Sequence, residues 1–147
     1  MTNKQSSEDG TLSKEEINWL LMRAEGGFGI ITTAATHVVP DGQGWKGEMG
    51  VWGDHHVPGL TRLATGIRER GAISLAQIFH GGMFAPEAIT GVRPVSASEN
   101  PLSKDSDETS RELSYDEIES IISAFGDAAS RCAKAGFDGV ELHGAHG

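Results

Sequence analysis

The chain has 147 residues, enough for one domain, and its hydrophobic content of 37% together with 20 glycines lies in the usual range of globular proteins. Its net charge of −9, from 21 acidic and 12 basic residues, opposes phosphate backbones and anionic lipid surfaces, so the sequence argues against nucleic acid or a membrane as a partner. The apolar runs are short and the first residues lack an apolar core, so neither a membrane span nor a signal peptide is expected.

The first predicted helix lies in the segment SKEEINWLLMRAEGG. Ser13 and Glu16 have the spacing of a capping box, and apolar residues then recur at intervals of three and four. The pair Gly26-Gly27 ends the helix.

Two further helices follow the same logic. The second is expected from near Pro58 to Gly71, with proline in the first turn and glycine past the end. The third is expected from a capping box at Ser114 and Glu117 to Gly136.

A short apolar segment follows each predicted helix. FGIITT begins at Phe28, AISLAQIF at Ala72 and FDGVELH at Phe137, and each is too short for a helix and suited to a strand. Alternating helices and strands predict a parallel sheet covered by helices, with the carboxyl ends of the strands at one edge. Because the chain opens on a helix and closes on a strand, we expect it to be part of a larger α/β unit, such as a (β/α)8 barrel of roughly 250 residues.

The chain contains one cysteine, Cys132, which cannot form an internal disulfide. This agrees with a reducing compartment, and we expect a cytoplasmic protein. Because Cys132 falls in an apolar row of the third predicted helix, the sequence favours a buried core thiol over a nucleophile.

Two long connections, residues 38–57 and 81–113, separate the predicted elements. Loops of this length are either lids over a site or mobile segments. Within the first connection, His55 and His56 are expected to lie in a solvated turn before the second helix rather than to form a ligand set.

Unusual polar residues follow the three predicted strands, in TAATH, QIFHGG and LHGAHG. Ligand sites of α/β sheets form at the carboxyl ends of the strands. His143 and His146 stand in a glycine-rich turn, where two neutral imidazoles can donate N–H groups to one carbonyl or carboxylate oxygen. The Gln77 amide, expected at the same edge, suits the paired N–H and C=O groups of a flavin pyrimidine or a nucleobase.

The same histidines leave a metal site as an alternative, with His80 as a third ligand. No carboxylate or thiol stands beside them at a typical ligand spacing, so the sequence favours the metal-free interpretation. The chain has no G-x-G-x-x-G, P-loop or CxxC pattern, so nicotinamide binding in a Rossmann pocket has no support.

Several segments together resemble a known family. The runs RAEGGFGII, GVWGDHHVPGLTRL, AQIFHGG and AGFDGVELHGAHG are similar in order and spacing to those of the old yellow enzymes, the NADH:flavin oxidoreductases. The resemblance covers essentially the whole chain. It implies an FMN-binding (β/α)8 TIM barrel, of which residues 1–147 form the N-terminal portion from the end of strand one through strand four, incomplete at both ends.

The resemblance also implies roles for five residues. Thr2 and Ala35 match positions that approach the flavin, and Gln77 matches the amide that pairs with the flavin pyrimidine. His143 and His146 match the catalytic pair that holds the substrate carbonyl oxygen while hydride leaves flavin N5.

The implied activity is transfer of hydride from NAD(P)H, through FMN, to an α,β-unsaturated carbonyl or a similar small electrophile. A homo-oligomer is compatible with the sequence. The family's phosphate grip belongs to strands five to eight, beyond residue 147. The alternative is therefore a non-catalytic truncated product, or a half-barrel that needs a partner chain.

Overall fold

The central sheet is parallel. The computed structural model describes residues 2–105 and 107–145. The sheet has the strand order β2-β1-β3-β6, and every neighbouring pair is parallel. Its strands are β1 (Ile30–His37), β2 (Met49–Gly50), β3 (Ile73–Phe79) and β6 (Gly139–Leu142).

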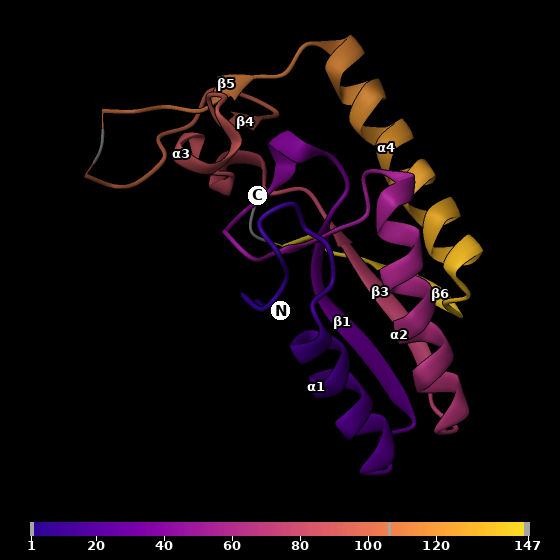
Figure 1. Ribbon diagram of the computed structural model, residues 1–147. Coiled ribbons are helices and arrows are strands. Elements are labelled where there is room, and N and C mark those ends of the chain that lie inside the picture. Colours follow the sequence, from indigo (N-terminus) through magenta and orange to yellow (C-terminus); the bar gives the residue numbers. More distant parts are fainter. Residues whose placement is uncertain (1, 106, 146–147) are drawn as a thin grey trace.

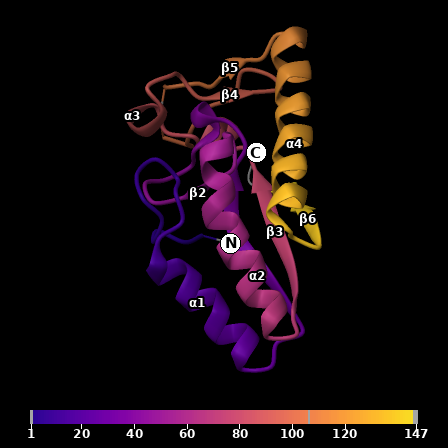
Figure 2. The same cartoon turned by 45° about the vertical axis from the view of Figure 1, so that its right-hand side comes forward.

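Three long helices cover one face of this sheet, with α2 between the other two (Figures 1 and 2). The alternation of helix and strand along the chain is the predicted one. The helices are α1 (Lys14–Glu25), α2 (Val57–Glu69) and α4 (Tyr115–Ala135). Among the described residues, no helix combines the length and the apolar character needed to cross a bilayer.

The helix ends largely follow the predicted capping signals. Ser114 and Glu117 form a complete capping box at the start of α4, and Gly136 ends it in a left-handed conformation with φ of 93°. At α1, Ser13 accepts the backbone N–H of Glu16. The Glu16 carboxylate does not complete a box, because it instead binds the side chains of Ser6 and Asn3.

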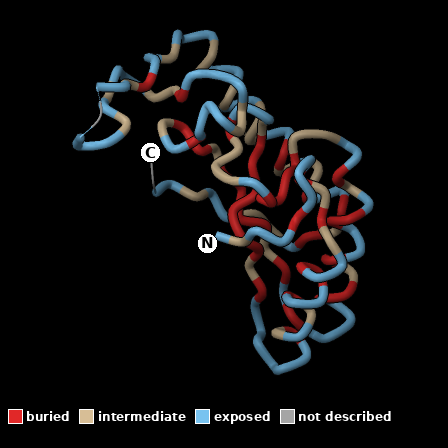
Figure 3. Tube along the Cα trace, turned by 60° about the vertical axis from the view of Figure 1, so that its left-hand side comes forward, coloured by how far each residue is buried: buried red, intermediate tan, exposed pale blue. Residues whose placement is uncertain are grey.

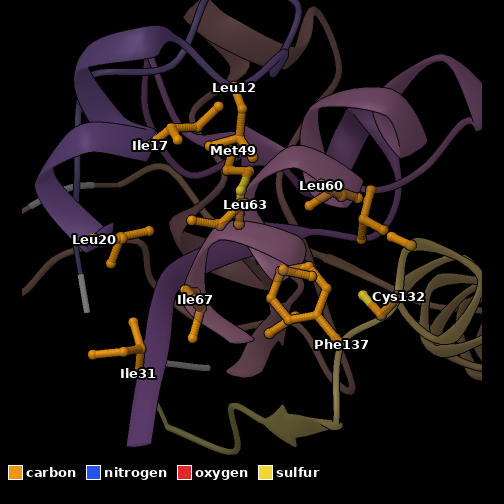
Figure 4. Packing of buried hydrophobic residues seen from close by; sticks show 14 of the residues in the cluster. Leu12, Ile17, Leu20, Ile31, Met49, Leu60, Leu63, Ile67, Cys132 and Phe137 are labelled. Atoms are coloured by element: carbon orange, nitrogen blue, oxygen red, sulfur yellow. The ribbon is translucent and has the colours of Figure 1, made fainter. Parts of the chain in front are cut away.

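The core lies between α2 and the sheet (Figure 4). Leu63 and Ile67 of α2 are fully buried, and they meet side chains from α1, α4 and the facing side of the strands. Cys132 is 1% exposed, which confirms the predicted core thiol. Burial raises its pKa to about 12, so the thiol stays protonated near neutral pH.

The first strand is longer than predicted. The segment TAATH, expected to follow the strand, lies within β1 itself. The reason is pairing on both sides: Thr36 and His37 pair with β2 at one edge and with Ile78 and Phe79 of β3 at the other.

The second long connection contains small elements and little core. Figure 3 shows most of this part of the tube exposed, whereas the buried residues gather along the strands and α2. Its short strands pair in parallel with each other and not with the main sheet. The elements are α3 (Glu87–Thr90), β4 (Val95–Ser96) and β5 (Arg111–Glu112), after a 3-10 turn at Gly82–Phe84.

The prediction of a solvated His55–His56 turn was wrong for one of its two residues. A 3-10 turn at Asp54–His56 does precede α2, and His55 is exposed. His56, however, is 3% exposed. It fits because Gly50 has no side chain: a Cβ there would lie 2.9 Å from the His56 ring.

Candidate functional site

A cavity of about 320 Å³ lies at the carboxyl ends of the strands. It brings together three of the residues predicted to form a site: Thr2, Ala35 and His143. Aromatic residues make up much of the remaining wall. The lining is completed by Gly44, Trp45, Phe79 and Phe84.

Ala35 reaches the cavity because β1 contains one extra residue. The register of β1 with β3 shifts between Thr32 and Ala35, so that Ala35 and not Ala34 lies opposite Gln77. In a strand without the bulge, the alternation of faces would turn Ala35 toward the helices, as Ile31 is turned. The bulge therefore places a small side chain in the cavity wall.

The Thr33 hydroxyl stabilises this bulge. Its oxygen accepts the backbone N–H of Gln77 at 3.0 Å, a donor that regular pairing would direct to the β1 backbone. The same hydroxyl donates to the Ala34 carbonyl at 2.8 Å. Thr33 is fully buried, so this contact lies inside the sheet.

Gln77 lies beside the cavity, in register with Ala35 on one side and with Glu141 on the other. Its side chain is 6% exposed, and its amide nitrogen donates to the Glu141 carboxylate. The predicted proximity of Gln77 to Ala35 is therefore present. Gln77 does not itself belong to the cavity lining.

His143 follows β6 directly and is half-buried. Its backbone N–H donates to the Ile78 carbonyl at 3.1 Å, which extends the β3–β6 pairing by one step. Its ring meets the Phe79 ring edge-on, with centroids 5.4 Å apart. His146, the second member of the predicted pair, lies outside the described residues.

The aromatic wall was not identified from the sequence. Trp45 and Phe79 stand with ring centroids 5.9 Å apart, and Phe84 is half exposed at the rim. The one available signal was a tryptophan inside the glycine-rich 38–57 connection. Phe79, the last residue of β3, also ends the predicted strand segment AISLAQIF, but nothing in that segment indicated that its ring would line a cavity.

His80, the third ligand of the alternative metal site, makes a structural contact. Its Nδ1 accepts the backbone N–H of Gly82 at 2.9 Å, and burial lowers its pKa, so the ring is a neutral structural acceptor. Within residues 2–105 and 107–145, no group of three His, Cys, Asp or Glu side chains is placed to hold a metal ion.

Buried titratable groups lie behind the cavity wall. Glu48 is fully buried; burial raises its pKa to about 8, opposed by N–H groups of Gly44 and Trp45. Burial lowers the pKa of His37 to about 4, opposed by a hydrogen bond to the Met49 backbone. The Nδ1 of His37 and the Oε2 of Glu48 are 3.8 Å apart, and since burial disfavours both charges, this is a contact between neutral groups near pH 7.

The cavity suits a flat, largely apolar ring with a polar edge. Ala35 and Gly44 contribute little or no side chain to the lining and so leave space in the cavity. A Cβ at Gly44 would lie 3.3 Å from the Phe79 ring. Thr2 and His143 bring hydroxyl and imidazole groups to the same space. The described lining includes no lysine or arginine, so it provides no cationic contact for a phosphate.

Comparison with known proteins identifies the family of the chain. The family model described as "NADH:flavin oxidoreductase / NADH oxidase family" matches residues 1–147. A probable NADH-dependent flavin oxidoreductase of Bacillus subtilis (strain 168) is 37% identical over 147 residues, which are 100% of this chain and 39% of that protein. An NADH:acrylate oxidoreductase of Vibrio harveyi is 40% identical over 147 residues, 99% of this chain and 14% of that protein.

A solved structure, the old yellow enzyme homologue of Zymomonas mobilis, superposes with a TM-score of 0.88 at 27% identity, covering 97% of this chain and 42% of that one. This likeness confirms the predicted fold class, with helices and parallel strands that correspond to part of a (β/α)8 barrel. The chain spans less than half the length of each of these proteins. On the match of its full length to the family model, the chain belongs to the NADH:flavin oxidoreductase / NADH oxidase family.

Proposed function

We propose that the protein is an FMN-dependent oxidoreductase that passes hydride from NAD(P)H to an α,β-unsaturated carbonyl or a similar small electrophile. The observation that supports this most is the cavity at the carboxyl ends of the strands. It joins Thr2, Ala35 and His143 to an aromatic wall, with Gln77 in register beside Ala35.

Three residues would hold the flavin. Ala35 would leave space for the ring, Thr2 would place a hydroxyl near its polar edge, and the Gln77 amide would pair with the pyrimidine. When bound, FMN supplies the capacity to accept and release hydride. The Gln77 amide now donates to Glu141, so pairing with a ligand would require that this contact be shared or exchanged.

The two histidines would orient the substrate. His143 stands at the cavity, where its imidazole can donate an N–H to a carbonyl oxygen. Such a donor stabilises negative charge that develops on the oxygen as the neighbouring double bond is reduced. We assign the second donor to His146, which lies three residues further along the chain.

The substrate class is supported by the cavity and by two relatives. The wall of Trp45, Phe79 and Phe84 favours a small, flat molecule. The names of the Vibrio harveyi protein and of a Klebsiella pneumoniae relative, NADH:fumarate oxidoreductase, specify alkenes conjugated to a carboxylate. We extend this to an activated alkene for the present protein.

The cellular setting belongs to the same proposal. The buried Cys132 has no disulfide and suits a reducing cytoplasm. The small-molecule substrate requires no macromolecular partner, and a homo-oligomer is compatible with the fold.

The test uses the protein as its own cell makes it. Its intact mass is measured first, since 15.6 kDa would favour the truncated product or half-barrel and a larger mass would provide the whole enzyme. We then expect yellow flavin absorbance in the purified protein, and a loss of about tenfold or more in flavin affinity for Gln77→Ala. The control is Gln5→Ala at an exposed amide, which should retain the flavin. Absence of bound flavin, or equal affinity in both variants, would refute the proposal.

A further inference from the structure

The turn that carries Trp45 is closed by the side chain of Glu48. The carboxylate Oε2 accepts the backbone N–H of Gly44 at 2.6 Å. In return, the Glu48 backbone N–H donates to the Trp45 carbonyl at 3.3 Å. Residues 44–48 therefore form a turn that is closed by hydrogen bonds of both the side chain and the backbone of Glu48.

Trp45 joins two parts of the cavity wall that come from distant segments. Its indole N–H donates to the backbone carbonyl of Asn3, next to Thr2. Its ring faces Phe79 at the end of β3, and Phe79 in turn meets His143. The position of this one indole thus bears on both the N-terminal segment and the strand ends.

Burying a carboxyl group to stabilise a turn carries a desolvation penalty. Glu48 is fully buried, and its Oε1 has no hydrogen-bond partner among the described residues. The Nδ1 of His37, 3.8 Å from Oε2, is also without one in the part of the chain that the structure describes. Buried polar atoms without partners are rare in proteins because each adds a desolvation penalty. An apolar residue would avoid that cost but could not accept the Gly44 N–H of the turn.

We propose that Glu48 is a positioning residue of the active site: its carboxyl group fixes the Gly44–Trp45 turn, so that the indole stands between Asn3 and Phe79 and sets the width of the cavity. The inference rests on the proposed function for its catalytic consequence, but not for its geometry. Glu48 itself does not line the cavity, so it acts through Trp45.

The first experiment measures the geometry alone. In the protein as the cell makes it, with isotope-labelled tryptophan, we follow solvent exchange of the Trp45 indole proton by NMR and assign its signal with Trp45→Phe. Glu48→Ala leaves the backbone N–H of Gly44 without its acceptor, and we expect indole exchange to accelerate about tenfold or more. Glu48→Gln retains a carbonyl oxygen for the turn and should exchange within about twofold of the parent protein. Equal exchange in Glu48→Ala and the parent would overturn the inference.

The second experiment measures the consequence for the substrate, with cyclohexenone as the probe. We expect Glu48→Ala to raise KM about tenfold with kcat changed less than about twofold, because a displaced wall weakens binding without altering the reacting groups. Ile67→Val, a core substitution within α2, controls for loss of stability and should leave KM unchanged. Equal rises in KM for Glu48→Ala and Ile67→Val would overturn the positioning role. Absence of flavin in the parent protein, together with accelerated indole exchange in Glu48→Ala, would refute the proposed function and support the positioning of Trp45.

Discussion

The helix-covered face of the sheet and the carboxyl edge of its strands differ in chemistry. On the helix-covered face, Leu63, Ile67 and Ile78 pack together without polar groups, and all three are fully buried. At the carboxyl edge, His37, Glu48 and His56 are equally buried but retain polar atoms without partners among the described residues. Burial of apolar side chains in the first region stabilises the fold. The second region, beside the cavity, buries polar atoms whose desolvation lowers stability. We interpret the difference as a division between a part that stabilises the fold and a part that shapes the site.

The largest effect is expected on the helix-covered face. Leu63→Ala removes a fully buried side chain of α2 and should lower the free energy of unfolding by about 3 kcal/mol, from lost burial and the cavity that remains. Denaturant unfolding measures this change. Flavin affinity of the folded fraction should stay within about twofold of the parent, because Leu63 lies away from the cavity lining. A large loss of flavin affinity would break the division between the two regions.

A smaller effect is expected from pH, and it isolates the carboxyl edge. Burial raises the pKa of Glu48 from 4.5 to about 8, so between these values the folded protein keeps a proton that the unfolded chain has released. This contribution to stability is complete below pH 4.5 and is lost as pH rises through 8. The slope of the unfolding free energy against pH from this one group is at most about 1.4 kcal/mol per pH unit.

The histidines of this edge act in the opposite direction and in a different window. Burial lowers the pKa of His37 and of His56 from 6.5 to about 4. Their contribution is complete above pH 6.5 and is lost as pH falls through 4, because the unfolded chain then binds protons that the folded protein excludes.

Unfolding free energies measured between pH 6.5 and 8 therefore report mainly on Glu48. Stability of the parent protein should fall across this interval, and the fall should be smaller in Glu48→Gln, which cannot titrate. His37, which faces Glu48, is neutral throughout the interval. If the unfolding free energies of the two proteins fall equally with pH, Glu48 titrates in its ordinary range. The carboxyl edge would then not differ from the helix-covered face in the way that we infer.

Much of the helix-covered region could be predicted from the sequence. Its helices are defined by local signals, such as the capping box at Ser114 and the glycine at Gly136, together with an apolar period that needs no knowledge of distant residues. The alternation of helices and strands along the chain, and the parallel sheet that it implies, followed from the same signals. A larger α/β unit such as a (β/α)8 barrel was expected from the same order of elements, the resemblance specified the barrel, and the comparison with solved structures confirms this fold class.

The carboxyl edge was predicted less completely, because its features depend on contacts between distant segments. β2 is two residues long and exists through its pairing with Thr36 and His37. The burial of His56 depends on the missing side chain of Gly50, and the site of Trp45 depends on Asn3, 42 residues away in sequence. No local pattern contains this information.

The smallest expected effect concerns the bulge in β1, where the two regions meet. Thr33→Val keeps the shape of the side chain but removes the oxygen that accepts the Gln77 N–H, so a buried donor loses its partner. We expect a loss of about 1 kcal/mol in unfolding free energy. Flavin affinity should fall as well, by about tenfold if the strand relaxes toward the unbulged register, since Ala35 would then turn away from the cavity. Thr32→Val, one residue earlier in the same strand, is the matched control. If both variants bind flavin as the parent does, Thr33 contributes only to stability, and the boundary between the two regions lies nearer the cavity than the bulge.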